Sequence, residues 1–166
     1  IKCPKPIIAE VEGTATAAGC QLVASCDLAY ASSSAKFATP GVNIGLFCST
    51  PMVAISRNLS NKHSMEMLLT GELISSDKAA KIGLINDVIE INKLKDFTLD
   101  KAQKISKKSS VTLKIGKEAF YKQLDMKLSD AYDYASKVMV QNMLKLDAKE
   151  GIDAFIDKRE PNWKDK

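Results

Sequence analysis

Residues 7–31 read IIAEVEGTATAAGCQLVASCDLAYA, and this stretch decides the fold class of the chain. Its first six residues are rich in strand-forming side chains and run into Gly13, which is typical of a strand followed by a tight turn. After a run of small residues, a helical apolar pattern begins close to Ala18, and residues 28–31 predict a second strand. Residues 36–38 predict a third strand before a Pro-Gly turn. Strand, turn, helix and strand in this order indicate a layered α/β fold.

The rest of the chain is predicted to be mainly helical. Ser60 or Asn61 can cap a helix that stops at Gly71, and Ser76 can cap a shorter helix that stops at Gly83. A strand over 84–89 comes next, followed by four helical stretches at 93–108, 110–122, 128–146 and 148–158. The apolar stripe of the third stretch is typical of a core or a subunit interface. We therefore divide the chain into an α/β region, 1–92, and a helical region, 93–166.

The composition is that of an ordinary globular domain, with 166 residues, 45% of them hydrophobic and 27% charged. Every apolar run is far shorter than the roughly 18 residues that cross a bilayer, so no membrane span is expected. The net charge of +4 comes largely from lysines between residues 93 and 122. Phe97 is the one aromatic residue between Lys95 and Lys117, so solvated helix faces are favoured over a nucleic-acid site.

Cysteine and histidine are too sparse and scattered to suggest a metal site. The four cysteines form no CxxC pair, and His63 is the single histidine, which we expect on a helix surface. Reduced thiols and no bound metal are therefore expected. The first residues show neither an initiator Met nor a targeting pattern, so we expect a piece of a longer chain.

Residues 13–21 form the first candidate site, because a helix starts there directly after a strand. Free N–H groups in the first turn of a helix, assisted by the helix dipole, stabilise an anion or a polarised carbonyl. Small residues such as Gly19 would let another molecule approach the backbone. Tight packing between the helix and its neighbours is the alternative explanation of the same pattern, and the residues alone leave both open.

A second feature is the absence of carboxylates between Asp27 and Glu66. Residues 37–51, FATPGVNIGLFCSTP, are typical of a loop that lines a pocket, yet they offer no Asp or Glu as a general base. Their polar side chains are more often turn formers or satisfied hydroxyls than catalysts; they are Asn43, Cys48, Ser49 and Thr50.

Taken together, these segments resemble the crotonase, or enoyl-CoA hydratase/isomerase, superfamily. The resemblance rests on an ordered series of four stretches: residues 5–31, residues 37–51, MLLTGELISSDKAAKIGLINDVI (67–89) and EGIDAFIDKREPNW (150–163). It implies a crotonase-like spiral of ββα turns with two roughly perpendicular sheets, of which residues 1–92 are the C-terminal part. It also implies that the helices of 93–166 assemble the protein into trimers or pairs of trimers.

The resemblance implies an acyl-CoA thioester as the substrate and no further cofactor. Its carbonyl would accept two backbone N–H bonds, one from Ala18 beside Gly19 and one from a residue that precedes this chain. The two glutamates of family hydratases correspond to Gln21 and Gly41, so standard hydration is expected to be weak or absent. An acid of related isomerases corresponds to Ser49, which with Pro40 would lie at the substrate.

The last helix is implied to reach the CoA nucleotide through Phe155 and Lys158. Without the resemblance, a Phe in the helix core and an exposed Lys are the favoured explanation of these two residues. Two functions stay open: an enzyme acting on an acyl-CoA thioester of fatty-acid metabolism, with Gln21 as a positioning group, or a non-catalytic protein that binds acyl-CoA or regulates. The resemblance implies a mitochondrial location.

Overall fold

The computed structural model describes residues 1–166 and divides them into two compact units. Residues 7–102 form the α/β unit, and residues 1–6 with 103–166 form the helical unit. The division falls inside the long helix α5 (Ile91–Ser106), later than residue 92. The first turns of α5 belong with the α/β unit, where Phe97 meets Tyr30 edge-on with 5.1 Å between ring centroids.

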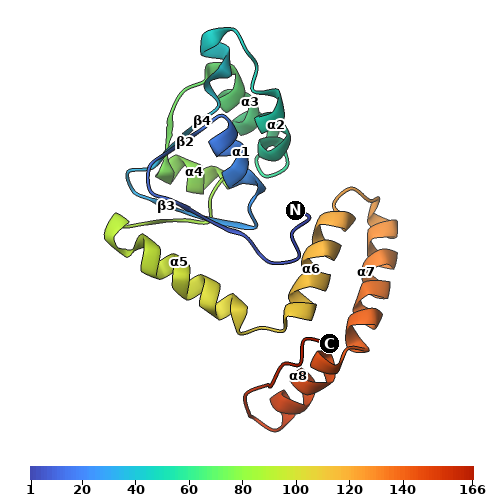
Figure 1. The fold of residues 1–166 in the computed structure, drawn as a ribbon. Helices are drawn as coiled ribbons and strands as arrows, with labels where there is room; N and C mark the ends of the chain where they lie inside the picture. Colours follow the sequence, from blue (N-terminus) through green and yellow to red (C-terminus); the bar gives the residue numbers. More distant parts are fainter. The chain divides into compact units, whose positions relative to one another are not determined.

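Six short strands of the α/β unit form two sheets of three strands each. The first sheet is parallel throughout and contains β1 (Ile8–Val11), β3 (Leu28–Ser32) and β6 (Asp87–Ile89), in that order. The second pairs β2 (Thr14–Thr16) with β4 (Lys36–Ala38) in parallel, and β4 with β5 (Ile74–Ser75) in antiparallel. The first two strand pairs each give one strand to either sheet and then lead into a helix (Figure 1). This is the predicted ββα arrangement.

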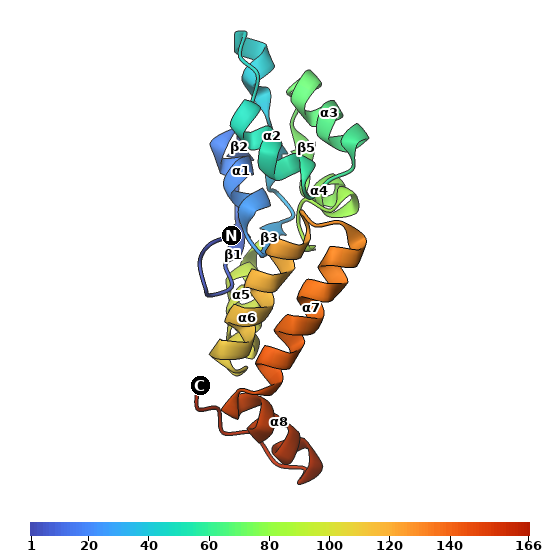
Figure 2. The same cartoon turned by 90° about the vertical axis from the view of Figure 1, so that its right-hand side faces the viewer.

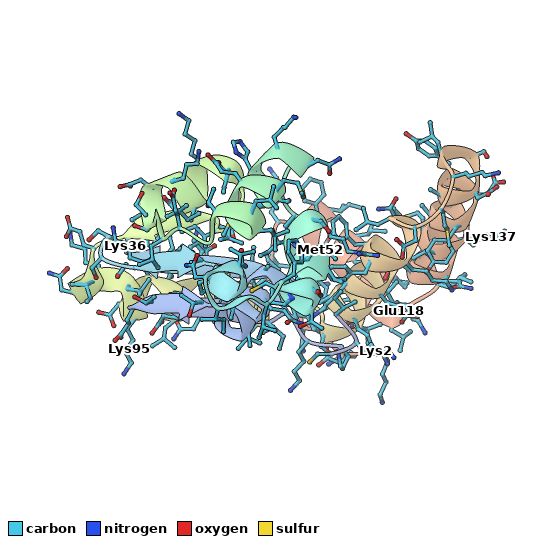
Figure 3. The ribbon with its side chains drawn as sticks, turned by 90° about the horizontal axis from the view of Figure 1, so that it is seen from above. Lys2, Lys36, Met52, Lys95, Glu118 and Lys137 are labelled. Atoms are coloured by element: carbon cyan, nitrogen blue, oxygen red, sulfur yellow. The ribbon has the colours of Figure 1, made fainter.

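Helices pack around these sheets and complete the core of the α/β unit. They are α1 (Ala18–Ser25), the 3₁₀ helix η1 (Pro40–Ile44), α2 (Ser49–Ser56), α3 (Asn61–Thr70) and α4 (Ser76–Ile82). Phe37, Ile55 and Met67 are buried where the helices meet the sheets. Lys36, whose side chain lies on the opposite face of β4 from that of its neighbour Phe37, is exposed at the surface (Figure 3).

Polar caps and left-handed glycines define the predicted helix ends. Ser60 caps α3 by accepting the N–H of His63, and Gly71 ends that helix in the left-handed conformation. Gly83 ends α4 in the same way, as predicted. The cap of α4 is Ser75, which accepts the N–H of Lys78, and not Ser76, which is buried inside the first turn. That assignment was wrong by one residue.

Several elements were not predicted from the sequence pattern. β2 and β5 have three and two residues, and both depend on pairing with β4. The strand expected over 84–89 shortens to β6, because Leu84 and Ile85 are buried in the turn that precedes it. Helix α2 begins at Ser49, inside the stretch expected to be a loop.

The helical unit contains α6 (Ser110–Gln123), α7 (Leu128–Met143) and α8 (Leu146–Ile156). These helices and α5 agree with the four predicted stretches to within three residues at each end. Leu128, Met139 and Met143 of the predicted apolar stripe on α7 are all exposed, so this stripe stays largely uncovered. None of the helices of the chain is long and apolar enough to cross a membrane.

Candidate functional site

The start of α1 is fixed by a strained turn at Ala17. This residue adopts φ 47° and ψ −113°, a region that non-glycine residues rarely occupy, and such a conformation costs about 1–3 kcal/mol. Two hydrogen bonds hold it: the Ala17 N–H donates to the carbonyl of Ala38 at 3.0 Å, and the Ala17 carbonyl accepts the N–H of Gln21 at 3.0 Å. Because strand pairing aligns Thr16 with Ala38, the sheet determines where the helix begins.

This turn leaves backbone donors free at the opening of α1. The N–H groups of Ala18 and Gly19 donate to no acceptor within the chain, since the first residues of a helix have no partner one turn earlier. Ala18 is exposed and Gly19 is half-buried. A Cβ on Gly19 would meet only the Ala15 Cβ at 3.8 Å, so this glycine leaves room without being required by packing.

Gln21 lies one turn into α1 and is half-buried. Its backbone carbonyl accepts the Ser25 hydroxyl at 2.7 Å, whereas its side-chain amide bonds to no other residue of the chain. An amide both donates and accepts, so it can orient a substrate or a water. It cannot carry a proton as a carboxylate does.

Gly41 lies in η1 at a place where no side chain fits without movement. A Cβ on Gly41 would lie 2.8 Å from the carbonyl oxygen of Leu46 and 3.0 Å from Sγ of Cys48. The Gly41 N–H donates to that sulfur at 3.3 Å, and the Gly41 carbonyl accepts the N–H of Leu46 at 3.0 Å. The turn from Pro40 to Cys48 therefore leaves no space for a side chain at position 41.

Three of the expected segments meet in the α/β unit: the start of α1, η1 and the start of α2. The hydrogen bond from the Ala17 N–H to the Ala38 carbonyl joins the residue before α1 to the end of β4. Pro40, the first residue of η1, follows two residues later. Helix α1 packs against α2, and the sulfur of Cys48, directly before α2, accepts the Gly41 N–H of η1. The structure thus brings Ala18, Gly19, Gln21, Pro40 and Gly41 into one region.

The buried Cys20 thiol of this region is a poor nucleophile and a poor acid. Burial raises the pKa of Cys20 to about 12, and the neighbouring Cys48 adds to this shift. Cys20 therefore stays a thiol near neutral pH, which matches its fully buried position. Ser49, the first residue of α2, is exposed, and its hydroxyl donates to the Phe47 carbonyl at 3.3 Å.

Neither a metal cluster nor a histidine base is part of this region. The structure has no group of three or more His, Cys, Asp or Glu side chains that could hold a metal ion. His63 lies on the surface of α3, where Nδ1 is 3.7 Å from Glu66. Glu66 also contacts Nζ of Lys78 at 3.5 Å, so the first carboxylate after Asp27 is held in surface ion pairs.

The second set of expected residues lies at the end of α8 in the helical unit. Phe155 is 85% exposed, so its ring is not a core residue. Lys158 follows the helix with φ 54°, and its N–H donates to the Phe155 carbonyl while the Arg159 N–H donates to the carbonyl of Ala154. This pair of bonds is the Schellman motif, in which the Lys158 position usually holds glycine. A cavity of about 500 Å³ adjoins Phe155, between α6, α8 and Trp163.

Two small sheets wound with helices into ββα turns and followed by a helical unit define an α/β protein of the crotonase type. The family model described as enoyl-CoA hydratase/isomerase matches residues 1–166, and the chain belongs to that family.

Similar proteins of known sequence or structure agree with this assignment. Mouse enoyl-CoA hydratase domain-containing protein 3, mitochondrial, is 54% identical over 96% of this chain and 53% of its own length. The crystal structure of the human protein of that name is 51% identical with a TM-score of 0.94, over 96% of this chain and 63% of that one. An enoyl-CoA hydratase from Mycobacterium smegmatis is 48% identical, also with a TM-score of 0.94, over 96% of this chain and 62% of that one. The chain spans about half the length of the curated relatives it matches.

The sequence did not predict the backbone features that determine the shape of the candidate site, at Ala17 and around Gly41. The strain at Ala17 gives no sequence signal, because alanine usually avoids a positive φ. The closure of Gly41 by Leu46 and Cys48 is likewise set by the path of the chain between η1 and α2.

Proposed function

We propose that this protein binds acyl-CoA thioesters and that the Ala18 N–H polarises the thioester carbonyl. Support comes from the free N–H groups at the start of α1, which follow a strained turn at Ala17 that is held by the hydrogen bond from its N–H to the Ala38 carbonyl. Strained backbone that survives in a folded protein gathers at functional sites. A fixed N–H dipole aimed at a developing oxyanion is worth several kcal/mol in catalysis, on the order of 3 for one donor.

Hydration of enoyl-CoA is proposed to be weak or absent in this protein. Hydration requires a water to be activated and a proton to be delivered, and the two positions concerned hold an amide at Gln21 and a closed backbone turn at Gly41. A reaction that depends mainly on enolate stabilisation remains compatible with this site. The closure of Gly41 equally favours the second candidate, a binding or regulatory protein without turnover.

At the other end of the ligand, Phe155 and Lys158 are proposed to contact the CoA nucleotide. The exposed ring of Phe155 offers a stacking surface, and the Lys158 ammonium offers charge to phosphates. We further propose a mitochondrial location, because the mouse and human relatives are named as mitochondrial proteins. Assembly through α7 into a trimer or hexamer belongs to the same proposal, since its apolar stripe is exposed.

The test separates binding, polarisation and turnover in the complete protein. Affinity for crotonyl-CoA is measured by calorimetry, and hydration is followed by the loss of enoyl thioester absorbance, with an established enoyl-CoA hydratase assayed in parallel. Infrared spectra of bound crotonyl-CoA labelled with ¹³C at the carbonyl report polarisation. We expect binding, a lowered carbonyl frequency, and hydration at least about a hundredfold below the reference enzyme. An unshifted carbonyl would contradict the role of Ala18, and no binding would contradict the whole proposal.

A further inference from the structure

The last residues of the chain return along α8 and attach to the rest of the helical unit (Figures 1 and 2). Residues 159–166, here called the C-terminal strap, follow the Schellman turn at Lys158. The Trp163 indole N–H donates to the Lys107 carbonyl at 2.7 Å, just after α5 ends. Its ring covers Gly151 of α8 so closely that a Cβ there would lie 3.2 Å from a ring carbon. One side chain thereby connects the α5–α6 junction to the middle of α8.

Asp147, in the first turn of α8, is the main anchor of the strap. Its side chain is only 1% exposed, and buried carboxylates are retained in proteins when hydrogen bonds satisfy them. It accepts the hydroxyl of Ser109 and the N–H groups of Lys164 at 2.7 Å and Asp165 at 3.1 Å. Ser109 in turn caps α6 by accepting the N–H of Thr112 at 3.2 Å.

Two further carboxylates extend these attachments. Asp165 accepts the backbone N–H of Ser110 at 2.9 Å and its hydroxyl at 2.7 Å, so its charge lies at the favourable N-terminal end of α6. Glu150 accepts two bonds from the Arg159 guanidinium, at 2.7 and 3.1 Å, and the N–H of Asn162 at 2.7 Å. The N-terminal half of α8 is thereby tied to the strap by Asp147 and Glu150.

We propose that the strap is a positioning element for the ligand contacts of α8, with Asp147 and Trp163 as positioning residues for Phe155 and Lys158. This inference rests on the proposed binding of CoA by those two residues. A chain end that makes no specific bonds frays, and a lysine in left-handed conformation is unfavourable unless its surroundings hold it. Arg159, the next residue, makes the first side-chain bond of the strap, from its guanidinium to the Glu150 carboxylate.

The test uses the complete protein and two ligands that differ only at the end concerned. Crotonyl-CoA carries the nucleotide, and crotonyl-pantetheine lacks it. Asp147→Asn keeps the shape of the anchor and removes its charge, and Trp163→Phe keeps a ring and removes the bond to Lys107. Lys149→Ala is the matched control, because it breaks an exposed ion pair with Asp153 on the same helix and removes no hydrogen bond to the strap.

We expect Asp147→Asn and Trp163→Phe to weaken crotonyl-CoA binding about tenfold, because less of the contact surface is preorganised. Crotonyl-pantetheine binding should change less than about twofold, since it does not use α8. A purely structural effect would lower both affinities together. Hydrogen exchange of residues 159–166 shows directly whether the strap is released in each variant.

The outcomes separate this inference from the function on which it rests. Equal affinities in the wild type for the two ligands would show that α8 does not contact the nucleotide, and would overturn the inference while leaving thioester binding intact. If a variant releases the strap while the ratio of its affinities for crotonyl-CoA and crotonyl-pantetheine stays at the wild-type value, this result would overturn the positioning role of the strap and leave the proposed CoA binding intact. A strap that stays protected in both variants would show that neither residue anchors it. If Asp147→Asn fails to fold, Trp163→Phe decides the question.

Discussion

At the scale of single residues, Gln21 and Gly41, the two positions where the resemblance implies glutamates, differ in what they can accommodate. Gln21 lies on a helix with its amide unbonded, so a carboxylate of nearly the same size fits there. Gly41 is enclosed by the Leu46 carbonyl and the Cys48 sulfur. A single substitution could therefore place a carboxylate at position 21, whereas the backbone around position 41 would have to move to accept one.

The first prediction compares these two positions by substitution. Gly41→Glu should lower the free energy of unfolding by about 1–3 kcal/mol, because the new side chain forces the turn to move. Gln21→Glu should change it by less than about 1 kcal/mol. Denaturant unfolding of both variants measures the difference. Equal stabilities would mean that the turn over Gly41 opens easily, and hydration restored by Gly41→Glu alone would contradict the closed site.

The second prediction concerns the left-handed Lys158. Lys158→Gly should raise the free energy of unfolding by about 0.5–1 kcal/mol, because glycine avoids the steric cost of a positive φ but loses more chain entropy. The same variant should bind crotonyl-CoA more weakly, since the ammonium group is gone. Lys158→Ala is the control that removes the charge and keeps the strain. A glycine variant that is less stable than wild type would show that the lysine contributes packing instead.

At the scale of elements, the sequence predicts those helices that carry their own signals. Ser60 and Gly71 delimit α3 through contacts made within the helix itself, so the pattern was sufficient. Helix α2 has no side-chain cap, and in the sequence Pro51, which lies in its first turn, is typical of a helix break. Proline is tolerated there because the N–H it lacks would have no helical partner. The strands β2 and β5 exist only through pairing with β4, which no local pattern contains.

The C-terminal strap gives the third prediction, a dependence on pH. The bonds from Arg159 and from the N–H of Asn162 lower the pKa of Glu150 from 4.5 to about 2. A lowered carboxyl pKa stabilises the folded state above the unfolded pKa, and this contribution disappears as the pH falls toward the folded value. Protection of residues 159–166 in hydrogen exchange should therefore decline between pH 4.5 and about 2.

Asp147 acts in the same direction on the strap. Burial raises its carboxyl pKa, but the bonds from Ser109, Lys164 and Asp165 outweigh burial and leave the pKa below its usual value. Glu150→Gln removes the charge that pairs with Arg159. In this variant, residues 159–166 should therefore be less protected already at neutral pH, and their protection should decline less in acid than in the wild type. An identical pH profile in wild type and variant would show that the pair of Glu150 and Arg159 does not hold the strap.

At the scale of the whole molecule, the family and the fold were predictable from the ordered series of segments, and the family model and solved structures agree. The candidate site was predictable only as a set of positions. Its physical state depends on long-range contacts, such as the bond from Ala17 to Ala38, that join segments about twenty residues apart. The exposure of Phe155 was also beyond the sequence pattern, which suits a buried ring equally well.

The last prediction follows from apolar surface in the helical unit. Many large apolar side chains of its helices are exposed, among them Leu128, Tyr132, Met139, Val140, Met143 and Leu144 on or next to α7. Soluble monomers rarely expose apolar patches of more than a few hundred Å², so these 166 residues produced alone should self-associate. Light scattering after size-exclusion chromatography measures the mass. Met139→Lys should reduce the association, and Lys137→Glu, at an already charged and exposed site on the same helix (Figure 3), should leave it unchanged. A monodisperse monomer would contradict an unpartnered face on α7.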